Sequence, residues 1–200
     1  SAASDVYKRQ VYLLLGSIPI TENDKLFNRS ILINPDGDII SIYDKIHMFD
    51  ITLKNGESYK ESDFYSPGSE LKITKVLGHS VGHTICYDLR YPKLYRALAK
   101  KGSQIIVVPS AFTHTTGKAH WHSLIKARAI ENGVFILAPN QWGVNNEKRV
   151  TYGHTLIVDP WGETLAEAED GEMIIAAELD LNRVRECLSL IHISEPTRHR

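Results

Sequence analysis

The chain has little cysteine, no long hydrophobic run and almost no net charge. Its 200 residues include only two cysteines, Cys86 and Cys187, which excludes a disulfide framework and favours a reducing, cytoplasmic setting. No apolar stretch approaches the roughly 20 residues of a membrane span. A formal net charge of −1 gives no electrostatic reason to bind nucleic acid or an acidic membrane. We therefore expect a globular protein that binds neither.

The composition predicts one domain with two foreign ends. With 42% hydrophobic and 24% charged residues, the chain can bury one sizeable core. Residues 1–10 are polar and aperiodic, and residues 188–200 end in a basic tail. Both ends resemble translated sequencing-adapter read-through, so we predict that they are non-native and that the domain comprises residues 11–187.

Strand-like and helix-like segments alternate along that domain. Residues 105–108 and 134–137 are continuous apolar runs, typical of central strands covered on both faces. Between them, residues 117–132 have helical spacing and Gly133 closes the helix. The pattern predicts a layered α/β protein with some antiparallel strands. Other predicted elements are a hairpin of residues 29–34 and 39–43, strands at 11–15, 71–77 and 81–85, a helix at 93–101, and further elements at 153–159, 163–168 and 173–179.

Cys86 lies where a nucleophile is often carried. It ends the β-like run of residues 81–85 and precedes the helical segment, so it is expected at the carboxyl edge of a sheet. A free cysteine is more often a small buried hydrophobe than a nucleophile. Its position alone does not decide between these two interpretations.

Two upstream residues could assist a catalytic thiol. An ordinary thiol is mostly protonated at neutral pH, so catalysis needs a neighbouring base or cation. Lys45 follows the second strand of the predicted hairpin, and Glu61 lies in a polar loop. Taken singly, each is more often a solvated surface charge.

Several motifs resemble the nitrilase superfamily of carbon-nitrogen hydrolases. The lysine, cysteine and substrate-loop motifs are matched by Tyr43-Asp-Lys-Ile-His-Met-Phe-Asp50, Gly82-His-Thr-Ile-Cys-Tyr-Asp-Leu-Arg-Tyr-Pro92 and Pro109-Ser-Ala-Phe-Thr113. The match extends to His120-Trp121, Arg128-Ala-Ile-Glu131, Tyr152-Gly-His-Thr155 and Asp159-Pro-Trp-Gly-Glu163. The order and spacing of these motifs are similar to the ω-amidase and deaminated-glutathione amidase branch.

The resemblance implies a fold and a mechanism. The fold is a four-layer α-β-β-α sandwich of the nitrilase type, here lacking its N-terminal strand and helix. Cys86 attacks an amide and forms a thioester, while Lys45 and the backbone N–H of Tyr87 stabilise the oxyanion. Glu61 matches the family's second carboxylate. The family's general base, a glutamate in an upstream Pro-Glu motif, has no counterpart in this sequence, so we expect a fragment with impaired activity.

Other site residues have weaker support from the resemblance. Arg90 either orders the nucleophile loop or meets a substrate carboxylate, and an ion-pairing structural role is equally open. Phe112 and Thr113 are either substrate-loop residues or ordinary loop packing. His122 stands where many relatives have glutamate, and a helix-surface histidine is the simpler interpretation.

The histidines suggest two further alternatives. No pair has a compact zinc-ligand spacing with a cysteine, so the sequence predicts neither a metal site nor a cofactor. A cysteine-histidine hydrolase with His83 or His154 as base leaves Lys45 unexplained.

We expect hydrolysis of a carbon-nitrogen bond in a small linear amide that carries a carboxylate. Deaminated glutathione and ω-amides of keto acids are favoured, and N-carbamoyl amino acids are the closest rivals. Because the general base is missing, a catalytically silent interaction module is the alternative of a different class. The resemblance also implies a homodimer of the full-length protein.

Overall fold

A six-stranded mixed sheet forms the centre of the molecule. The structure, a computed structural model, describes residues 11–52, 56, 58–146 and 149–190. The strand order is β13-β12-β9-β8-β7-β6, with β7, β8 and β9 parallel and the remaining pairs antiparallel. The strands are β6 (Ile73–Val76), β7 (His79–His83), β8 (Ile105–Val107), β9 (Phe135–Ala138), β12 (Leu156–Val158) and β13 (Thr164–Glu167).

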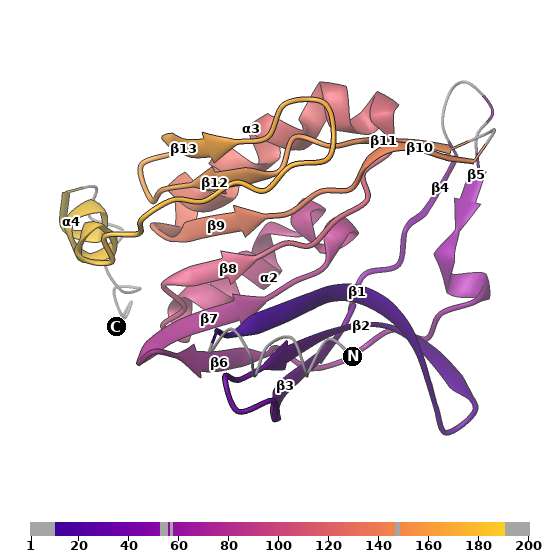
Figure 1. Cartoon of the computed structure of the whole chain (residues 1–200), viewed down its shortest axis with the longest axis horizontal. Helices are drawn as coiled ribbons and strands as arrows, with labels where there is room; N and C mark the ends of the chain where they lie inside the picture. The colour runs from indigo at the N-terminus through magenta and orange to yellow at the C-terminus, as the bar shows by residue number, and fades with distance from the viewer. Residues whose placement is uncertain (1–10, 53–55, 57, 147–148, 191–200) are drawn as a thin grey trace, which may run out of the picture.

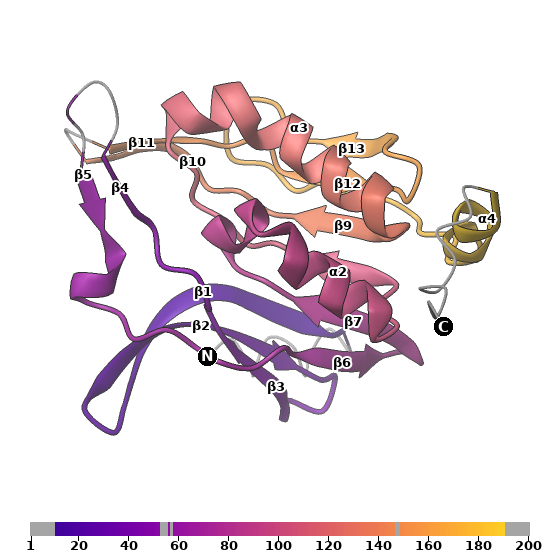
Figure 2. The same cartoon turned by 180° about the vertical axis from the view of Figure 1, so that it is seen from behind.

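Two helices cover one face of this sheet. Helices α2 (Pro92–Lys100) and α3 (His114–Asn132) run across it (Figure 2). Proline at the first position suits the start of α2, and Gly133 ends α3 in the left-handed conformation with φ of 63°. Ile106 and Ile136 at the centre of the sheet are fully buried, as expected for strands covered on both faces.

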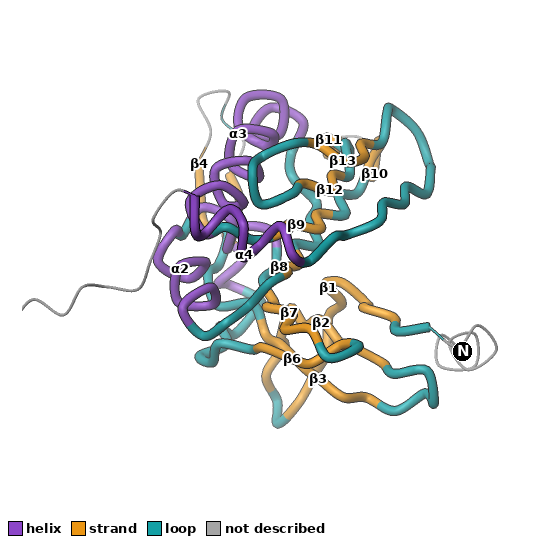
Figure 3. The backbone as a smooth tube through the Cα atoms, turned by 90° about the vertical axis from the view of Figure 1, so that its left-hand side faces the viewer, coloured by secondary structure: helices purple, strands orange, loops and turns teal. Residues whose placement is uncertain are grey.

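A second sheet lies on the opposite face. Strands β1 (Leu13–Glu22), β2 (Lys25–Ile33) and β3 (Ile39–Asp44) form an antiparallel sheet, and Figure 3 shows it across the larger sheet from the helices. Thr74 on β6 donates a 2.6 Å hydrogen bond to Ser41 on β3. The described residues therefore form one helical and two sheet layers of the predicted α/β sandwich.

Two short hairpins project from the same end of the molecule (Figure 1). One pairs β4 (Asp50–Thr52) with β5 (Ser58–Lys60) and continues into the 3-10 helix η1 (Glu61–Asp63). The other pairs β10 (Trp142–Asn146) with β11 (Arg149–Tyr152). Together they extend the carboxyl end of the parallel strands. Helix α4 (Asn182–Leu190) lies at the opposite end.

Most predicted elements are confirmed, but their bounds differ. The predicted hairpin is the β2–β3 pair, and residues 105–137 form the predicted strand-helix-strand unit of β8, α3 and β9. The strand predicted at residues 11–15 instead extends to Glu22. The element predicted at residues 173–179 is wrong, because that segment has no helix or strand. Ile174 in this segment is 97% exposed, and Met173 is 49% exposed.

The predicted domain bounds stay a prediction. Residues 1–10 and 191–200 lie outside the described residues, while α4 continues through residues 188–190.

Candidate functional site

Cys86 lies in a turn beyond the carboxyl end of β7. It begins the 3-10 helix η2 (Cys86–Arg90) with a left-handed φ of 48°, unusual for a residue other than glycine. Its backbone N–H donates a 3.0 Å hydrogen bond to the carbonyl of Pro109, just after β8. A conformation of this kind persists only where surrounding contacts hold it, and it is common at active sites.

The buried carboxylate of Asp88 supplies such contacts. One of its oxygens accepts hydrogen bonds from the backbone N–H of Ile85 at 2.9 Å and the hydroxyl of Tyr43 at 2.7 Å. The other accepts from the backbone N–H of His47 at 3.0 Å and lies 2.7 Å from His47 Nδ1. Burial and the negative charge of Asp88 raise the pKa of Tyr43, which keeps its hydroxyl protonated as a donor. Asp88 thus joins the Cys86 turn to β3 and the segment after it.

Lys45 and Glu61 form a pair beside Cys86. Lys45 follows β3 and is 2% exposed, and its Nζ lies 2.5 Å from Glu61 Oε2. The same oxygen accepts from the backbone N–H of Phe49 at 2.7 Å, and Oε1 accepts from Asn28 Nδ2 at 3.0 Å. Three donors therefore occupy the two carboxylate oxygens, and the ammonium group is held in one place.

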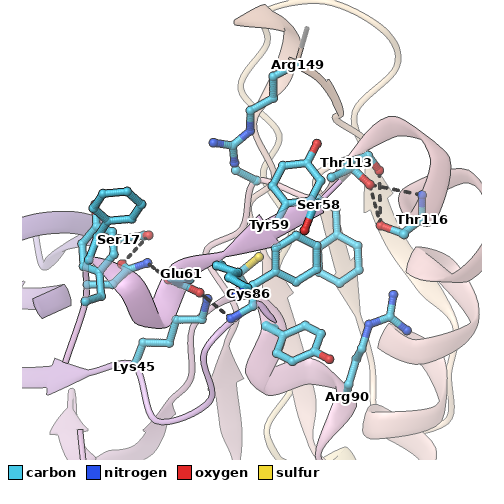
Figure 4. A pocket seen from close by; sticks show the side chains of 18 residues that line it. Ser17, Lys45, Ser58, Tyr59, Glu61, Cys86, Arg90, Thr113, Thr116 and Arg149 are labelled. Atoms are coloured by element: carbon cyan, nitrogen blue, oxygen red, sulfur yellow. Dashed lines mark hydrogen bonds and ion pairs between the residues drawn. The ribbon is translucent and has the colours of Figure 1, made fainter. Parts of the chain in front are cut away.

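One cavity of about 500 Å³ contains every predicted site residue. Figure 4 shows the Cys86 sulfur beside the Lys45–Glu61 pair, with Thr113 and Arg90 across the cavity. These residues lie in the loops and short helices that follow β3, β5, β7 and β8. The predicted residues in the lining are Lys45, Glu61, Cys86, Tyr87, Arg90, Phe112 and Thr113.

Aromatic rings and two arginines complete the cavity. The ring of Phe49 lies 5.1 Å from that of Tyr87 and 5.2 Å from that of Tyr59. The Arg90 guanidinium lies 5.7 Å from the Phe112 ring, and the exposed Arg149 on β11 reaches the lining from the hairpin. The cavity therefore combines apolar walls with positive charge.

Sequence reasoning missed some of these residues. Asn28 lies inside a strand, Asp88 has no role in the sequence beyond the cysteine motif, and no residue near Arg149 indicates a turn toward Cys86. Their partners are far apart in the chain, so no local signal could have shown them. The carbonyl of Asn28 on β2 accepts a 2.9 Å hydrogen bond from the backbone N–H of Lys45, so only the pairing of β2 with β3 brings Asn28 to the site.

The alternative histidine bases do not line this cavity. His83 is fully buried between the sheets, where its Nε2 lies 3.2 Å from the Thr74 hydroxyl. Burial, with a smaller contribution from Lys72, lowers the pKa of His83 to about 4. His154 lies 3.1 Å from Glu167, beside β13. The geometry therefore gives no support to a cysteine-histidine pair.

Comparison with known families identifies this arrangement. The profile of the carbon-nitrogen hydrolase family matches residues 3–188. The chain belongs to the carbon-nitrogen hydrolase family. This membership confirms the predicted nitrilase-superfamily resemblance and the predicted enzyme class, an amidase of that superfamily.

Named relatives of this carbon-nitrogen hydrolase are amidases. Over 189 residues it is 38% identical to omega-amidase NIT2 of Xenopus tropicalis, covering 94% of this chain and 68% of that protein. Over 183 residues it is 40% identical to a deaminated glutathione amidase of Synechocystis, covering 88% and 67%. The chain therefore spans about two thirds of these relatives.

A solved structure confirms the fold class of this carbon-nitrogen hydrolase. The crystal structure of Saccharomyces cerevisiae Nit3, a member of branch 10 of the nitrilase superfamily, superposes with a TM-score of 0.88 at 33% identity. The match covers 98% of this chain and 70% of Nit3. Within the described residues, none of the helices is both long enough and apolar enough to cross a membrane.

Proposed function

We propose that this protein cleaves the carbon-nitrogen bond of a small linear amide through a thioester on Cys86. The observation that carries the proposal is the meeting of Cys86, Lys45 and Glu61 in one cavity. In the first step the Cys86 thiolate attacks the amide carbon, and the carbonyl oxygen becomes an oxyanion. The amide nitrogen takes a proton and leaves as ammonia or an amine. Water then hydrolyses the thioester to a carboxylic acid and regenerates the thiol.

Lys45 is the proposed oxyanion stabiliser. Its side chain is almost fully buried and forms an ion pair with Glu61. The ammonium group is therefore held in one position and is shielded from water. The same charge stabilises the Cys86 thiolate. Tyr87 is the second residue of η2, and N–H groups in the first turn of a helix have no acceptor within it. Its N–H is the proposed second oxyanion donor.

Glu61 is better suited to position Lys45 than to act as the general base. Both of its oxygens already accept hydrogen bonds, one of them from two donors. It is the only carboxylate among the described residues that line the cavity. We therefore propose that acylation is slow in this chain, by the roughly 10²–10⁴-fold that a positioned base commonly contributes.

The positive lining supports a substrate with a carboxylate. Arg90 and Arg149 provide the guanidinium groups that suit bidentate carboxylate binding. The names of the relatives, omega-amidase and deaminated glutathione amidase, agree with the expected substrates, an ω-amide of a keto acid or deaminated glutathione.

Trapping of the acyl-enzyme tests the chemistry. The protein is incubated with a small activated ester and its mass is followed, with one acyl group per chain as the expected adduct. Cys86→Ala should abolish the adduct, whereas Cys187→Ala should retain it because Cys187 is buried in α4. Lys45→Met should slow acylation by about 10²–10³-fold. An unmodified parent protein would instead support a silent interaction module, and unchanged acylation in Lys45→Met would refute its oxyanion role.

A pair of equal-length amides tests the substrate class. Glutaramate carries a carboxylate and pentanamide does not, so glutaramate should acylate Cys86 faster. Arg149→Gln and Arg90→Gln should reduce that preference and leave the pentanamide rate unchanged. Faster reaction of an N-carbamoyl amino acid than of glutaramate would favour the rival substrate class.

A further inference from the structure

Three side chains capable of metal binding meet outside the cavity. His122 lies on α3, His154 just before β12 and Glu167 at the end of β13. His122 Nε2 lies 2.8 Å and His154 Nδ1 lies 3.1 Å from the same atom, Glu167 Oε1. All three ligand atoms lie within 4.8 Å of one another. None of the three residues lines the cavity that contains Cys86.

The separations suit a small tetrahedral ion. Zinc bonds to imidazole nitrogen and carboxylate oxygen of about 2.0–2.2 Å place neighbouring ligand atoms roughly 3.3 Å apart in a tetrahedron. The two separations to Glu167 are close to that value and all three ligand atoms lie within 4.8 Å of one another, so side-chain movements can bring them into a tetrahedron. Two imidazoles with one carboxylate are typical of zinc, whereas magnesium and calcium prefer oxygen ligands alone.

The three ligands are held by fixed parts of the fold. The carbonyl of His154 accepts a 2.7 Å hydrogen bond from Nε1 of the buried Trp121, and its backbone is left-handed with φ of 57°. In the β12–β13 ladder Glu167 pairs with Leu156, and Leu156 follows His154 by two residues. Figure 2 shows α3, which carries His122, alongside these strands. The cluster is therefore assembled by the backbone rather than by mobile loops.

A second carboxylate is placed as an outer partner. Asp170 Oδ1 lies 3.7 Å from His154 Nε2, the nitrogen that faces away from Glu167. Histidines that bind metals commonly donate their other N–H to a carboxylate, which fixes the ring tautomer and orientation. With its hydrogen on Nε2, on the side of Asp170, His154 can offer Nδ1 to an ion.

We propose that His122, His154 and Glu167 bind one zinc ion, with a solvent molecule as the fourth ligand. The side chains are 34%, 26% and 37% exposed, so water reaches the remaining position. In the bound state each neutral imidazole carries its hydrogen on the ring nitrogen that faces away from the ion, so two neutral imidazoles and one carboxylate surround the ion. The ligands come from three separate chain segments, so no spacing along the chain indicates the site. The ion would tie α3 to the β12–β13 edge of the sheet.

Calorimetric titration with zinc chloride tests this site. The untagged Cys86→Ala protein is used so that the cavity thiol does not bind zinc. We expect one zinc per chain, and a binding constant at least tenfold weaker in each of His122→Gln, His154→Gln and Glu167→Gln. Zinc at 100 times its Kd should raise the Tm of the parent by roughly 5–10 °C. Cobalt in place of zinc should give the visible absorption of a tetrahedral site.

Two controls separate this site from other sources of zinc binding. His79→Gln removes an exposed histidine near Gln104 and should leave zinc affinity unchanged. The triple variant of the three ligands retains every other histidine, so zinc binding equal to that of the parent would overturn the proposal. The proposal would also be overturned if the parent protein bound zinc with a Kd above about 100 µM or not at all. Tm values measured without zinc establish that each variant is folded.

Discussion

At the scale of single residues, the left-handed backbone of Cys86 has a measurable cost. For a residue other than glycine, the left-handed conformation is less favourable than the right-handed one by roughly 1–2 kcal/mol. With φ of 48° at this position, Cys86→Gly should be more stable than Cys86→Ala by about 1 kcal/mol. Urea unfolding of the two variants measures the difference.

Cys187 supplies the matched control. It lies within helix α4, where glycine is less favourable than alanine by about 1 kcal/mol. The order of stability should therefore reverse, with Cys187→Ala above Cys187→Gly. The same order at both positions would show that backbone strain at Cys86 is not what the variants measure.

His83 predicts a pH-dependent stability. Its folded pKa of about 4 lies below the ordinary value of 6.5, so the unfolded chain binds a proton more readily between these values. The neutral form stabilises the fold fully above pH 6.5, and that contribution is lost as the pH falls toward 4. From pH 7 to pH 5 we expect a loss of about 2 kcal/mol from this group.

The pH effect is tested by urea unfolding of the parent and of His83→Gln at both pH values. The variant should lose less stability on acidification, by about the same 2 kcal/mol, because glutamine does not titrate. An equal loss in the two proteins would assign the pH dependence to other groups.

At the scale of elements, the contact between α3 and β11 depends on a glycine. A Cβ on the buried Gly117 would lie 2.3 Å from Cβ and Cγ of Tyr152. Helix propensity alone favours Gly→Ala by about 1 kcal/mol. We nevertheless expect Gly117→Ala to destabilise the protein by about 1–3 kcal/mol, because the two elements must separate.

Thr115→Ala is the matched control for that prediction. Thr115 is exposed two residues earlier on the same helix, so replacing it should be neutral or slightly stabilising. Thermal unfolding of both variants is sufficient. A stabilised Gly117→Ala protein would contradict the close packing against Tyr152.

Elements with strong local signals were predictable. The apolar runs around α3 and the left-handed end at Gly133 are both encoded within a few residues, and the strand-helix-strand unit was predicted from them. The segment of residues 173–179 is also mostly apolar, yet it forms neither a helix nor a strand. Burial is a tertiary property, so apolar composition alone could not distinguish these cases.

The candidate site shows the same limit. Cys86 could be placed at a strand end because the change from β-like to turn residues is local. The positions of Lys45 and Glu61 followed only from the family resemblance, since neither has a chain neighbour that indicates a site. Asn28 contacts Glu61 across 33 residues, and no pattern along the chain encodes that contact.

At the scale of the whole molecule, Tyr43 joins the two sheets. It lies on β3, is 2% exposed, and donates its hydroxyl to the buried Asp88 at the end of the larger sheet. Hydrogen bonds to charged groups contribute roughly 1.5–3 kcal/mol. Tyr43→Phe should therefore destabilise the protein by about 2 kcal/mol and slow acylation of Cys86, because the carboxylate that holds the Cys86 turn loses a donor.

Tyr12→Phe is the control for this change. Tyr12 precedes β1 and is only partly buried, so loss of its hydroxyl should alter stability by less than about 0.5 kcal/mol. Equal effects of the two substitutions in urea unfolding would refute the special role of Tyr43.

The expected homodimer of the full-length protein stays a prediction. Light scattering distinguishes a monomer of 22.5 kDa from a dimer of twice that mass for the present chain.

The cavity is lined by residues from Ser17 on β1 to Arg149 on β11, so its walls come from distant parts of the chain. The β1–β2–β3 sheet is built from local hairpins, whereas the parallel strands require longer connections and form more slowly. Neither sheet contains the cavity by itself. During refolding, circular dichroism should recover first, and the capacity of Cys86 to accept an acyl group should appear only when the two sheets dock. Acylation is therefore a kinetic probe of the last assembly step.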